Sequence, residues 1–362
     1  MTVTDARKNS MSGRSAPTLE DVARRAGVST ATVSRCLNVP ERVLPATRER
    51  IILAVTQLGY TPNFGGQALA SNRTNTVGAV IPTMENAIFA RGIQAFQEAL
   101  AASGVTLLVA SSGYDPEREG EQIRALVGRG ADGLLLIGVT RPEATYSFLR
   151  QRGVPYVIAW NYRPGDDNLY AGFDNRSAAR ALATKVINYN HTMIAMIAGK
   201  TETNDRSADR VSGVRDALAA AGMDAQAMPV VETTYSLDGG GRAFETLMRR
   251  HNPPTAVICG NDVLAVGAMT GARELGISVP ADVSIVGFDD IDLALVVQPQ
   301  LTTVHVPHRR MGEAAAKLLL QLRDGHPNME SVILDTHVVE RGSLIRHVSG
   351  MPLFLGQGKA AV

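Results

Sequence analysis

The first apolar pattern along the chain has the period of a helix. The stripe recurs at spacings of three and four residues and consists of Leu19, Val22, Ala23 and Ala26. Charged side chains occupy the opposite side, which is the arrangement of an amphipathic helix. Thr18 precedes the stripe as an N-cap, and Asp21 follows three residues later as its acidic partner. Gly27 ends this helix.

A second short helix follows, with Ser29 as its N-cap. Its spacing turns Val33, Cys36 and Leu37 inward and leaves an outward face, which consists of Thr30, Ala31, Ser34 and Arg35. Two short helices joined by a glycine-containing turn, the second with small residues and an arginine outward, are typical of a helix-turn-helix that reads the DNA major groove. A plain helical hairpin is the alternative. A third amphipathic helix begins at Pro45 and ends at Gly59.

From Thr76 onward, short apolar runs alternate with helical patterns. The predicted strands are 77–81, 105–110, 133–137, 156–159, 193–198, 256–259 and 283–287. The predicted helices are 91–103, 117–128, 175–190, 206–221, 239–250 and 262–275. Continuous Val/Ile/Leu strands separated by helices indicate parallel sheets covered on both faces. The number of strands exceeds one ordinary sheet, so we expect two doubly wound lobes.

Composition narrows the possible classes of protein. The 362 residues suit two or three domains, and no apolar run approaches the roughly 20 residues needed to span a bilayer. The amino-terminal residues lack the apolar core of a secretion signal, so we expect a cytoplasmic protein. Residues 1–16 are polar and rich in serine, so we expect them to form a disordered arm. The only cysteines, Cys36 and Cys259, fall in separate predicted domains, which argues against a disulfide or a cysteine metal site.

Charge is unevenly distributed. Residues 1–73 contain ten Lys and Arg against five Asp and Glu, an excess of five positive charges. Because the whole chain carries a net charge of +1, the remainder carries −4. A basic head on a mildly acidic body indicates phosphate binding by one end of the molecule.

The run DVARRAGVSTATVSRCLN, followed by TRERI, LGYTPN and QALASNRTNTVGAVIP, closely resembles the start of the lactose-repressor/galactose-repressor (LacI/GalR) family of bacterial transcription regulators. The resemblance implies an all-α helix-turn-helix head joined to an α/β two-lobed core like a periplasmic binding protein. It implies a disordered arm at 1–16, a DNA-binding domain at 17–62, a hinge helix at 63–75, an effector-binding core at 76–345 and a tail at 346–362. Within the core, lobe 1 takes about 76–174 and 305–330, and lobe 2 about 175–304 and 331–345.

The same resemblance implies which side chains bind DNA. Thr30, Ala31 and Arg35 match the base-reading positions of the recognition helix, and Arg35 can bond a guanine with two donors. The side chains suited to phosphate anchoring are Thr18, Ser29, Thr32, Ser34 and Asn38. Leu44 stands where the family usually has a Ser or Thr N-cap, which weakens the third helix by about 1 kcal/mol.

Asn63 and Leu69 belong to the hinge segment, in which the residue matching Leu69 is a wedge inserted into the minor groove. This sequence departs from the family by carrying Gly65 and Gly66, each of which costs about 1 kcal/mol in a helix. We therefore expect the segment to be disordered without DNA. A flexible linker whose Leu69 merely packs is the alternative.

Ligands of open α/β sheets bind beyond the carboxyl ends of the strands, so we expect a site where the two lobes face each other. By match to the family, the effector-binding candidates are Phe89, Asp174, Arg206, Arg210, Tyr235, Asn261 and Asp289. Trp160 and Asn161 face the same region without an assigned role. Asp174 and Asp262 begin helices and could be ordinary N-caps, Arg210 could simply pair with an acid, and Phe89 could be core filler.

The runs GFDN, YS, NDVLAVGA and PHRRMG resemble the gluconate-repressor branch, which suggests a sugar acid as effector. The expected function is a DNA-binding transcriptional regulator, a repressor, controlled by a sugar or sugar acid bound between the lobes. Induction is the default, and a corepressor-dependent regulator that senses a non-sugar metabolite is the alternative. The tail has no leucine heptads for tetramerisation, so we expect a homodimer on a near-palindromic operator.

Two other classes fit less well. An enzyme would need a nucleophile elbow, a phosphate loop after a strand or histidines at metal-ligand spacing, and the sequence has none of these. We expect no catalytic residue, metal or cofactor. A free solute-binding protein would explain the body but leave residues 18–73 without a role.

Overall fold

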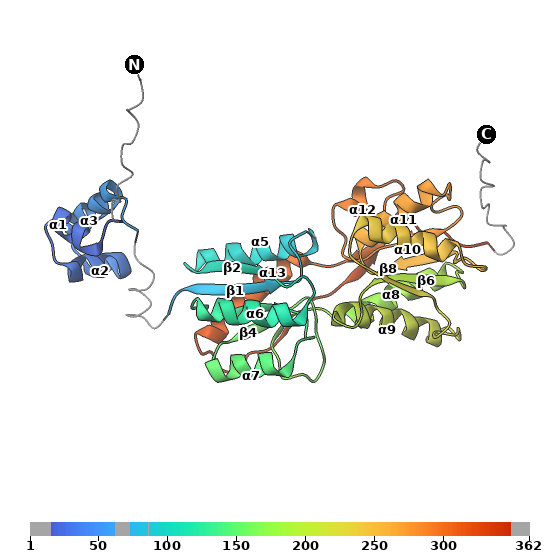
Figure 1. Ribbon diagram of the computed structural model, residues 1–362, viewed down its shortest axis with the longest axis horizontal. Coiled ribbons are helices and arrows are strands. Elements are labelled where there is room, and N and C mark those ends of the chain that lie inside the picture. Colours follow the sequence, from blue (N-terminus) through green and yellow to red (C-terminus); the bar gives the residue numbers. More distant parts are fainter. Residues whose placement is uncertain (1–15, 62–72, 86, 349–362) are drawn as a thin grey trace, which may run out of the picture. The chain divides into compact units, whose positions relative to one another are not determined.

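The computed structural model describes residues 16–61, 73–85 and 87–348. The chain divides into two compact units, Met1–Thr74 and Asn75–Val362 (Figure 1). The hinge candidates Asn63 and Leu69, residues 1–15 of the expected arm and the tail from residue 349 lie outside the described residues. Among the described residues, no helix has both the length and the apolar content needed to cross a membrane.

The first unit is a small bundle of helices. Its elements are α1 (Leu19–Ala26), α2 (Thr30–Asn38), the 3-10 turn η1 (Pro40–Arg42) and α3 (Pro45–Leu58). Val22, Val33 and Ile51, one from each α-helix, are fully buried and form the centre of its core. The three helices predicted from the sequence are therefore confirmed. Leu44 provides no side-chain cap for α3, as its departure from the family pattern predicts.

Lobe 1 of the second unit is built on a six-stranded sheet in the order β11-β5-β4-β3-β1-β2, with every pair parallel. Its strands are β1 (Thr76–Ile81), β2 (Thr106–Ser111), β3 (Leu134–Ile137), β4 (Tyr156–Ala159), β5 (Tyr170–Gly172) and β11 (Val332–Ile333). Its helices are α5 (Ala87–Ala102), α6 (Pro116–Gly128), α7 (Glu143–Arg152) and α13 (His308–Arg323).

Helices cover both faces of this sheet because its central strands are buried on both sides. Along β1, Val77 and Ala79 face one apolar cluster with Phe96 of α5 and Leu319 of α13. Val80 faces the opposite cluster, formed with α6 and α7. Figure 1 shows α5 and α6 on opposite sides of β1.

Lobe 2 repeats this plan with four parallel strands in the order β7-β6-β8-β9. Its strands are β6 (Ile194–Gly199), β7 (Val230–Thr233), β8 (Ala256–Cys259) and β9 (Ser284–Val286). Its helices are α8 (Asn175–Asn188), α9 (Asp205–Ala220), α10 (Leu237–Met248), α11 (Asp262–Glu274) and the short α12 (Leu293–Val296). The α8–α9 pair covers one face and the α10–α11 pair covers the other (Figure 1).

The chain crosses between the lobes three times. It passes from β5 to α8, returns through β10 (Thr303–His305) to α13, and crosses again from β11 to β12 (His337–Val339). The crossing strands β10 and β12 pair antiparallel with each other.

One boundary expected from the sequence is wrong. Residues 331–345 were expected wholly in lobe 2, but β11 pairs with β5 in the sheet of lobe 1. The Leu334 amide also donates to the Gly172 carbonyl, so the strand remains bonded to lobe 1 until that residue. The last crossing therefore follows residue 334.

Candidate DNA-reading surface and effector site

Helix α1 begins with a complete capping box. The Thr18 hydroxyl oxygen accepts from the Asp21 amide at 3.3 Å, and an Asp21 carboxylate oxygen accepts from the Thr18 amide at 2.9 Å. The carboxylate of Asp21 accepts from both the amide and the hydroxyl of Thr18, and these two bonds lower the pKa of Asp21. Gly27 then ends the helix at a φ of 66°, a left-handed conformation that favours glycine. Both ends of α1 are therefore defined, by the capping box at Thr18 and by the left-handed turn at Gly27 that leads to the next helix.

Helix α2 separates its inward and outward faces as the sequence predicts. Val33 and Cys36 are buried, whereas Thr30, Ala31 and Arg35 are exposed on the other side. Ser29 caps the helix by accepting from the Thr32 amide at 3.2 Å. An exposed strip of one arginine, one methyl group and one hydroxyl is suited to contacts with base edges in a groove.

The phosphate-anchoring candidates have local partners of their own. The hydroxyls of Ser29 and Thr32 lie 2.9 Å apart, and the Asn38 amide donates to the Ser34 hydroxyl at 3.3 Å. Ser29 and Asn38 are exposed and Thr32 and Ser34 are half-buried, so each of these groups can also turn toward a phosphate oxygen. Arg25 of α1 donates two hydrogen bonds, of 3.0 and 2.7 Å, to the side-chain oxygen of Gln57 in α3. These bonds join the two helices.

In lobe 2, Arg210 of α9 is the centre of a buried polar group. Its Nε donates to the Asn175 side chain at 2.8 Å and its Nη1 to the Gly260 carbonyl at 2.5 Å. Its Nη2 lies 3.4 Å from an Asp289 carboxylate oxygen, and its guanidinium stacks 3.8 Å from the centre of the Phe288 ring. The side chain is therefore fixed in direction before any ligand arrives.

Asp289 and Asn261 each leave one buried polar atom unused. Within the described part of the chain, Asp289 Oδ2 and Asn261 Nδ2 have no hydrogen-bond partner. The side-chain oxygen of Asn261 caps α11 by accepting from the Leu264 amide at 2.8 Å. Burial raises the pKa of Asp289 to about 7, although Arg210 opposes that shift. A buried acceptor and a buried donor without partners indicate a place for a polar ligand.

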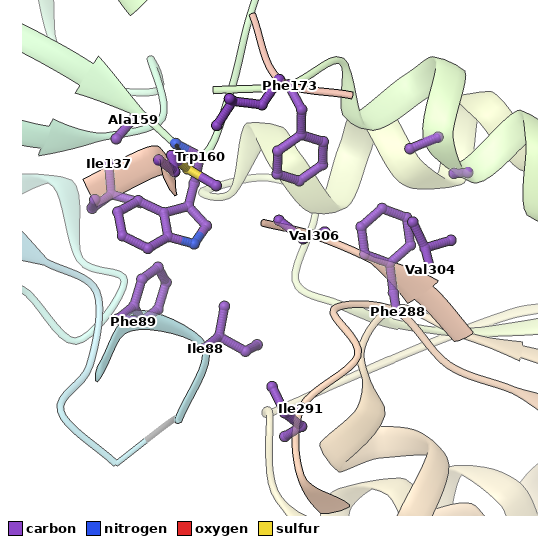
Figure 2. Packing of buried hydrophobic residues seen from close by; sticks show 14 of the residues in the cluster. Ile88, Phe89, Ile137, Ala159, Trp160, Phe173, Phe288, Ile291, Val304 and Val306 are labelled. Atoms are coloured by element: carbon purple, nitrogen blue, oxygen red, sulfur yellow. Dashed lines mark hydrogen bonds between the residues drawn. The ribbon is translucent and has the colours of Figure 1, made fainter. Parts of the chain in front are cut away.

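Aromatic side chains line the lobe 1 side of the site. Phe89 packs edge-on against Trp160, with ring centres 5.4 Å apart, and Figure 2 shows the two rings next to each other. Trp160 Nε1 donates to His308 Nδ1 at 3.2 Å, and the opposite nitrogen of His308 lies 3.3 Å from the Asp289 carbonyl. Burial lowers the pKa of His308 to about 3, so this ring is neutral and its Nε2–H donates to that carbonyl.

An open cavity of about 420 Å³ lies where strands of both lobes end. Its lining includes Thr83, Tyr114, Lys200, Asn204, Thr233 and Tyr235, which follow or end β1, β2, β6 and β7. The rings of Tyr114 and Tyr235 lie 5.7 Å apart across it. Burial raises the pKa of Tyr114, and the neighbouring Tyr235 acts in the same direction. The charge of Arg206 lowers this pKa and that of Asp289 raises it, so the cavity lies near the buried polar group. The prediction that strand ends of the two lobes face each other is confirmed.

A row of hydrogen bonds joins the lobes beside this cavity. One carboxylate oxygen of Asp205 accepts from the Val139 amide at 2.7 Å and from the Asn161 side chain at 2.6 Å. Arg206 donates to the Ile137 carbonyl at 3.2 Å and pairs with Asp205 at 2.8 Å. Arg206 is thus bound to lobe 1, and we refer to these contacts of Asp205 and Arg206 as the interlobe clasp.

Two acids singled out in the sequence have structural bonds. Asp174 caps α8 by accepting from the amide and the hydroxyl of Ser177, at 3.0 and 2.6 Å. Asp262 is buried and accepts from the Thr303 hydroxyl at 2.5 Å and from the Ile291 amide at 2.8 Å. A direct effector contact by Asp174 stays a prediction.

Sequence reasoning missed His308, Asn175 and Tyr114 and gave Trp160 no role. The sequence signal for His308 was its place in the PHRRMG run, which indicated a branch of the family and gave the histidine no role of its own. Their contributions depend on contacts between distant segments, such as the bond between Trp160 and His308. Within the described residues, no group of three or more His, Cys, Asp or Glu side chains could hold a metal ion.

Comparisons with known proteins agree with both units. Residues 18–63 match the model of bacterial regulatory proteins of the lacI family, and residues 183–344 match a periplasmic binding protein-like domain. The chain is 31% identical to catabolite control protein A of Priestia megaterium, over 89% of this chain and 97% of that protein. It is 33% identical to the transcriptional regulator GntR of Escherichia coli, over 84% and 91% of the two chains. It is 34% identical to the transcriptional repressor PurR of Vibrio atlanticus, over 90% and 98%.

Solved structures give the same result for the fold. A Lacl family transcriptional regulator from Silicibacter pomeroyi superposes with a TM-score of 0.82 at 26% identity, covering 91% of this chain and all of that one. The lac repressor dimer bound to operator and the anti-inducer ONPF superposes with a TM-score of 0.80 at 25% identity, with the same coverage.

Proposed function

Because the chain belongs to the LacI family of bacterial regulatory proteins, we propose that it represses transcription by binding an operator as a homodimer. We propose that a small polar effector controls its affinity for this operator. It is a DNA-binding transcriptional regulator and not an enzyme. Action on the chromosome implies a cytoplasmic location. The observation that carries the proposal is the pair of unused buried atoms on Asp289 and Asn261, in a chain whose head exposes a reading helix.

In the proposed complex, Thr30, Ala31 and Arg35 contact base edges and the hydroxyls and amide around them anchor phosphates. One head offers few specific contacts, so two heads related by a twofold axis would read a near-palindromic site. The lac repressor structure to which this chain is similar is a dimer bound to operator, which supports that arrangement. Asn63 and Leu69 are proposed to reach the minor groove between the two half-sites.

The effector is proposed to bind between the lobes, with its polar groups on Arg210, Asp289 and Asn261 and its carbon skeleton against Phe89 and Tyr235. Asp289 would accept from a hydroxyl and Asn261 would donate to an oxygen, which suits a sugar. A guanidinium and the nearby Arg206 suit a carboxylate, so a sugar acid fits both features. The 33% identity to GntR of Escherichia coli supports this class.

The direct test measures operator binding and effector binding together. DNA from upstream of the gene is titrated with the intact protein at a fixed physiological salt concentration, with random duplex as competitor. The core is then screened for thermal shifts with sugar acids, neutral sugars and purines. We expect preference for one upstream site and a shift with a sugar acid that also weakens operator binding. Absence of any preferred site, with or without metabolites, would refute the proposal.

A matched pair of variants separates the two sites. Arg210→Met should abolish the effector response and retain operator binding, whereas Arg35→Met should impair operator recognition and retain the thermal shift. Loss of both activities in the Arg210 variant would indicate misfolding, which circular dichroism detects.

Corepression by a non-sugar metabolite is the second candidate. The sign of the effector response distinguishes the two candidates. A metabolite that strengthens operator binding identifies a corepressor, and one that weakens it identifies an inducer.

A further inference from the structure

A second hollow lies at the opposite end of lobe 2 from the effector site. Its volume is about 450 Å³, and it opens where β6 begins and where α9 and α10 have ended. The six-residue strand β6 spans about 20 Å at roughly 3.3 Å per residue, so this hollow is separated from the strand ends that form the cleft. We call it the basal groove.

The basal groove is largely apolar and contains three methionines. Its apolar lining includes Met193, Ile194, Leu218, Met223, Met228 and Pro254. Met193, which directly precedes β6, is 40% exposed. Methionine is flexible and adapts to irregular apolar shapes, so three of them around one groove suit a peptide with mixed aliphatic and aromatic side chains.

The last described part of the chain runs toward this groove. The Ser343 carbonyl accepts from the Ile285 amide, and the Ile345 amide donates to the Ser284 hydroxyl, so increasing residue number leads toward the beginning of β9. The Ile345 carbonyl is then bonded to His191 at 3.0 Å.

The next contacts bring the chain to the edge of the groove itself. The His347 amide donates to the Tyr189 carbonyl at 2.8 Å, and its ring stacks on His191 with centres 5.5 Å apart. Thr192 and Met193, which directly follow His191, line the groove.

The sequence beyond Val348 supplies an apolar segment of suitable length. Residues 351–355 read MPLFL and are flanked by Gly350 and Gly356. Phe354 lies six positions after Val348, and six extended residues reach about 20 Å. This run is the most apolar stretch of residues 349–362.

We propose that residues 351–355 of the same chain dock in the basal groove, with Leu353 and Phe354 covering Met193, Met223 and Met228. The tail is then an intramolecular cover for the base of lobe 2. It removes an exposed apolar surface that would otherwise be available for self-association. This inference is independent of the identity of the effector.

Methionine oxidation tests the cover in the full chain. Intact protein and a Leu353→Asp/Phe354→Asp variant are treated with hydrogen peroxide, and sulfoxide formation at each methionine is followed by mass spectrometry. We expect Met193 and Met223 to oxidise several-fold faster in the variant. Met84, which is 62% exposed in lobe 1, should oxidise equally in both and serves as the internal control. A Lys359→Asp variant, altered in the tail outside the apolar run, should behave as the intact protein does.

A cross-link identifies the occupant. Phe354→Cys is combined with Met223→Cys, and a control pairs Phe354→Cys with Met84→Cys; the native Cys36 and Cys259 are buried. We expect rapid disulfide formation within one chain for the first pair and little for the control. Equal oxidation rates in the intact and Asp variants would overturn the proposal. Cross-links between chains, with oxidation rates that depend on protein concentration, would instead assign the groove to a second copy and also overturn it.

Discussion

The carboxyl group of Asp289 is fully buried, and one of its oxygens has no partner among the described residues. Its pKa of about 7 exceeds the usual value for an unfolded aspartate, about 3.9. Between those two values the folded chain holds a proton that the unfolded chain has released. The contribution of this group to stability is therefore greatest at low pH and falls as pH rises toward 7.

Asp289→Asn removes this titration. Relative to the natural protein, the variant should become more stable as pH rises from 5 to 7, by up to about 1.4 kcal/mol per pH unit, and show no further change above that range. Urea midpoints at pH 5, 6, 7 and 8 measure the difference. Asp216→Asn is the control, because its partner Arg176 lowers the pKa of Asp216 and the carboxylate stays ionised throughout. A flat difference for the Asp289 variant would contradict the expected proton.

Arg35 is exposed on α2 and can bond a guanine edge. Arg35→Ala should relax specificity at one base pair of each half-site, with a loss of about 1–3 kcal/mol of discrimination. Competition binding against operators altered one base pair at a time measures this. A uniform loss across all sequences, together with a smaller salt dependence, would show that Arg35 contacts only phosphate.

At the scale of single residues, the sequence predicted groups whose role is local. Thr18, Ser29 and Gly27 were identified because a cap depends on neighbours within four residues. The sequence could not pair Trp160 with His308, which lie 148 residues apart along the chain. No local pattern encodes such a contact.

The helices of the DNA-binding head differ in whether a side chain accepts hydrogen bonds from the amides of their first turns. α1 has a capping box, whereas α3 begins after Leu44, whose side chain makes no cap bond and is 77% exposed. Thr18→Ala should destabilise the head by about 1 kcal/mol, and Leu44→Ser should stabilise it by a similar amount because no burial is lost. Hydrogen exchange of amides in α1 and α3, compared in the intact chain, measures both changes. Unchanged exchange in both variants would mean that these caps do not limit opening of the head.

Elements were predicted well where their apolar period is long or their burial is complete. The strands at 156–159 and 256–259 match β4 and β8, which are nearly or fully buried. The sequence did not reveal β5, with only three residues, or β7, which is only partly buried and so lacks a continuous apolar run. Helix α7 was missed because only Thr145 and Leu149 are buried along it.

On the scale of the whole molecule, the interlobe clasp bonds lobe 1 to lobe 2 beside the candidate effector site. Asp205→Ala removes the acceptor of two hydrogen bonds from lobe 1 and leaves Arg206 without its carboxylate. Each bond to a charged group is worth about 1.5–3 kcal/mol, so the lobes should move apart without effector. Spin labels at Glu121→Cys and Glu202→Cys, one in each lobe, should report a longer mean distance.

Arg163→Ala is the matched control for this measurement. Arg163 and Asp209 lie 3.9 Å apart in a partly exposed pair, which contributes about 0–1 kcal/mol. The distance distribution should stay close to that of the natural protein. An unchanged distance in the Asp205 variant would show that other contacts hold the lobes together.

The two-lobed plan was predictable from alternating strands and helices together with the resemblance to the family, but the clasp was not. It joins Asp205 to a backbone amide of lobe 1, and a backbone amide carries no sequence signature. The last crossing was also misplaced, because β11 has only two residues and its pairing with β5 depends on the return of a distant segment.

Two of the three segments that cross between the lobes contain the strands β10 and β12, which are bonded to each other in an antiparallel ladder. A ladder bends readily out of its plane but resists shear within it, because shear would break several hydrogen bonds at once. This ladder therefore permits the two lobes to bend relative to each other and resists sliding or twisting of one lobe against the other. In the proposed function, an effector bound between the lobes would change their relative orientation mainly through this bending.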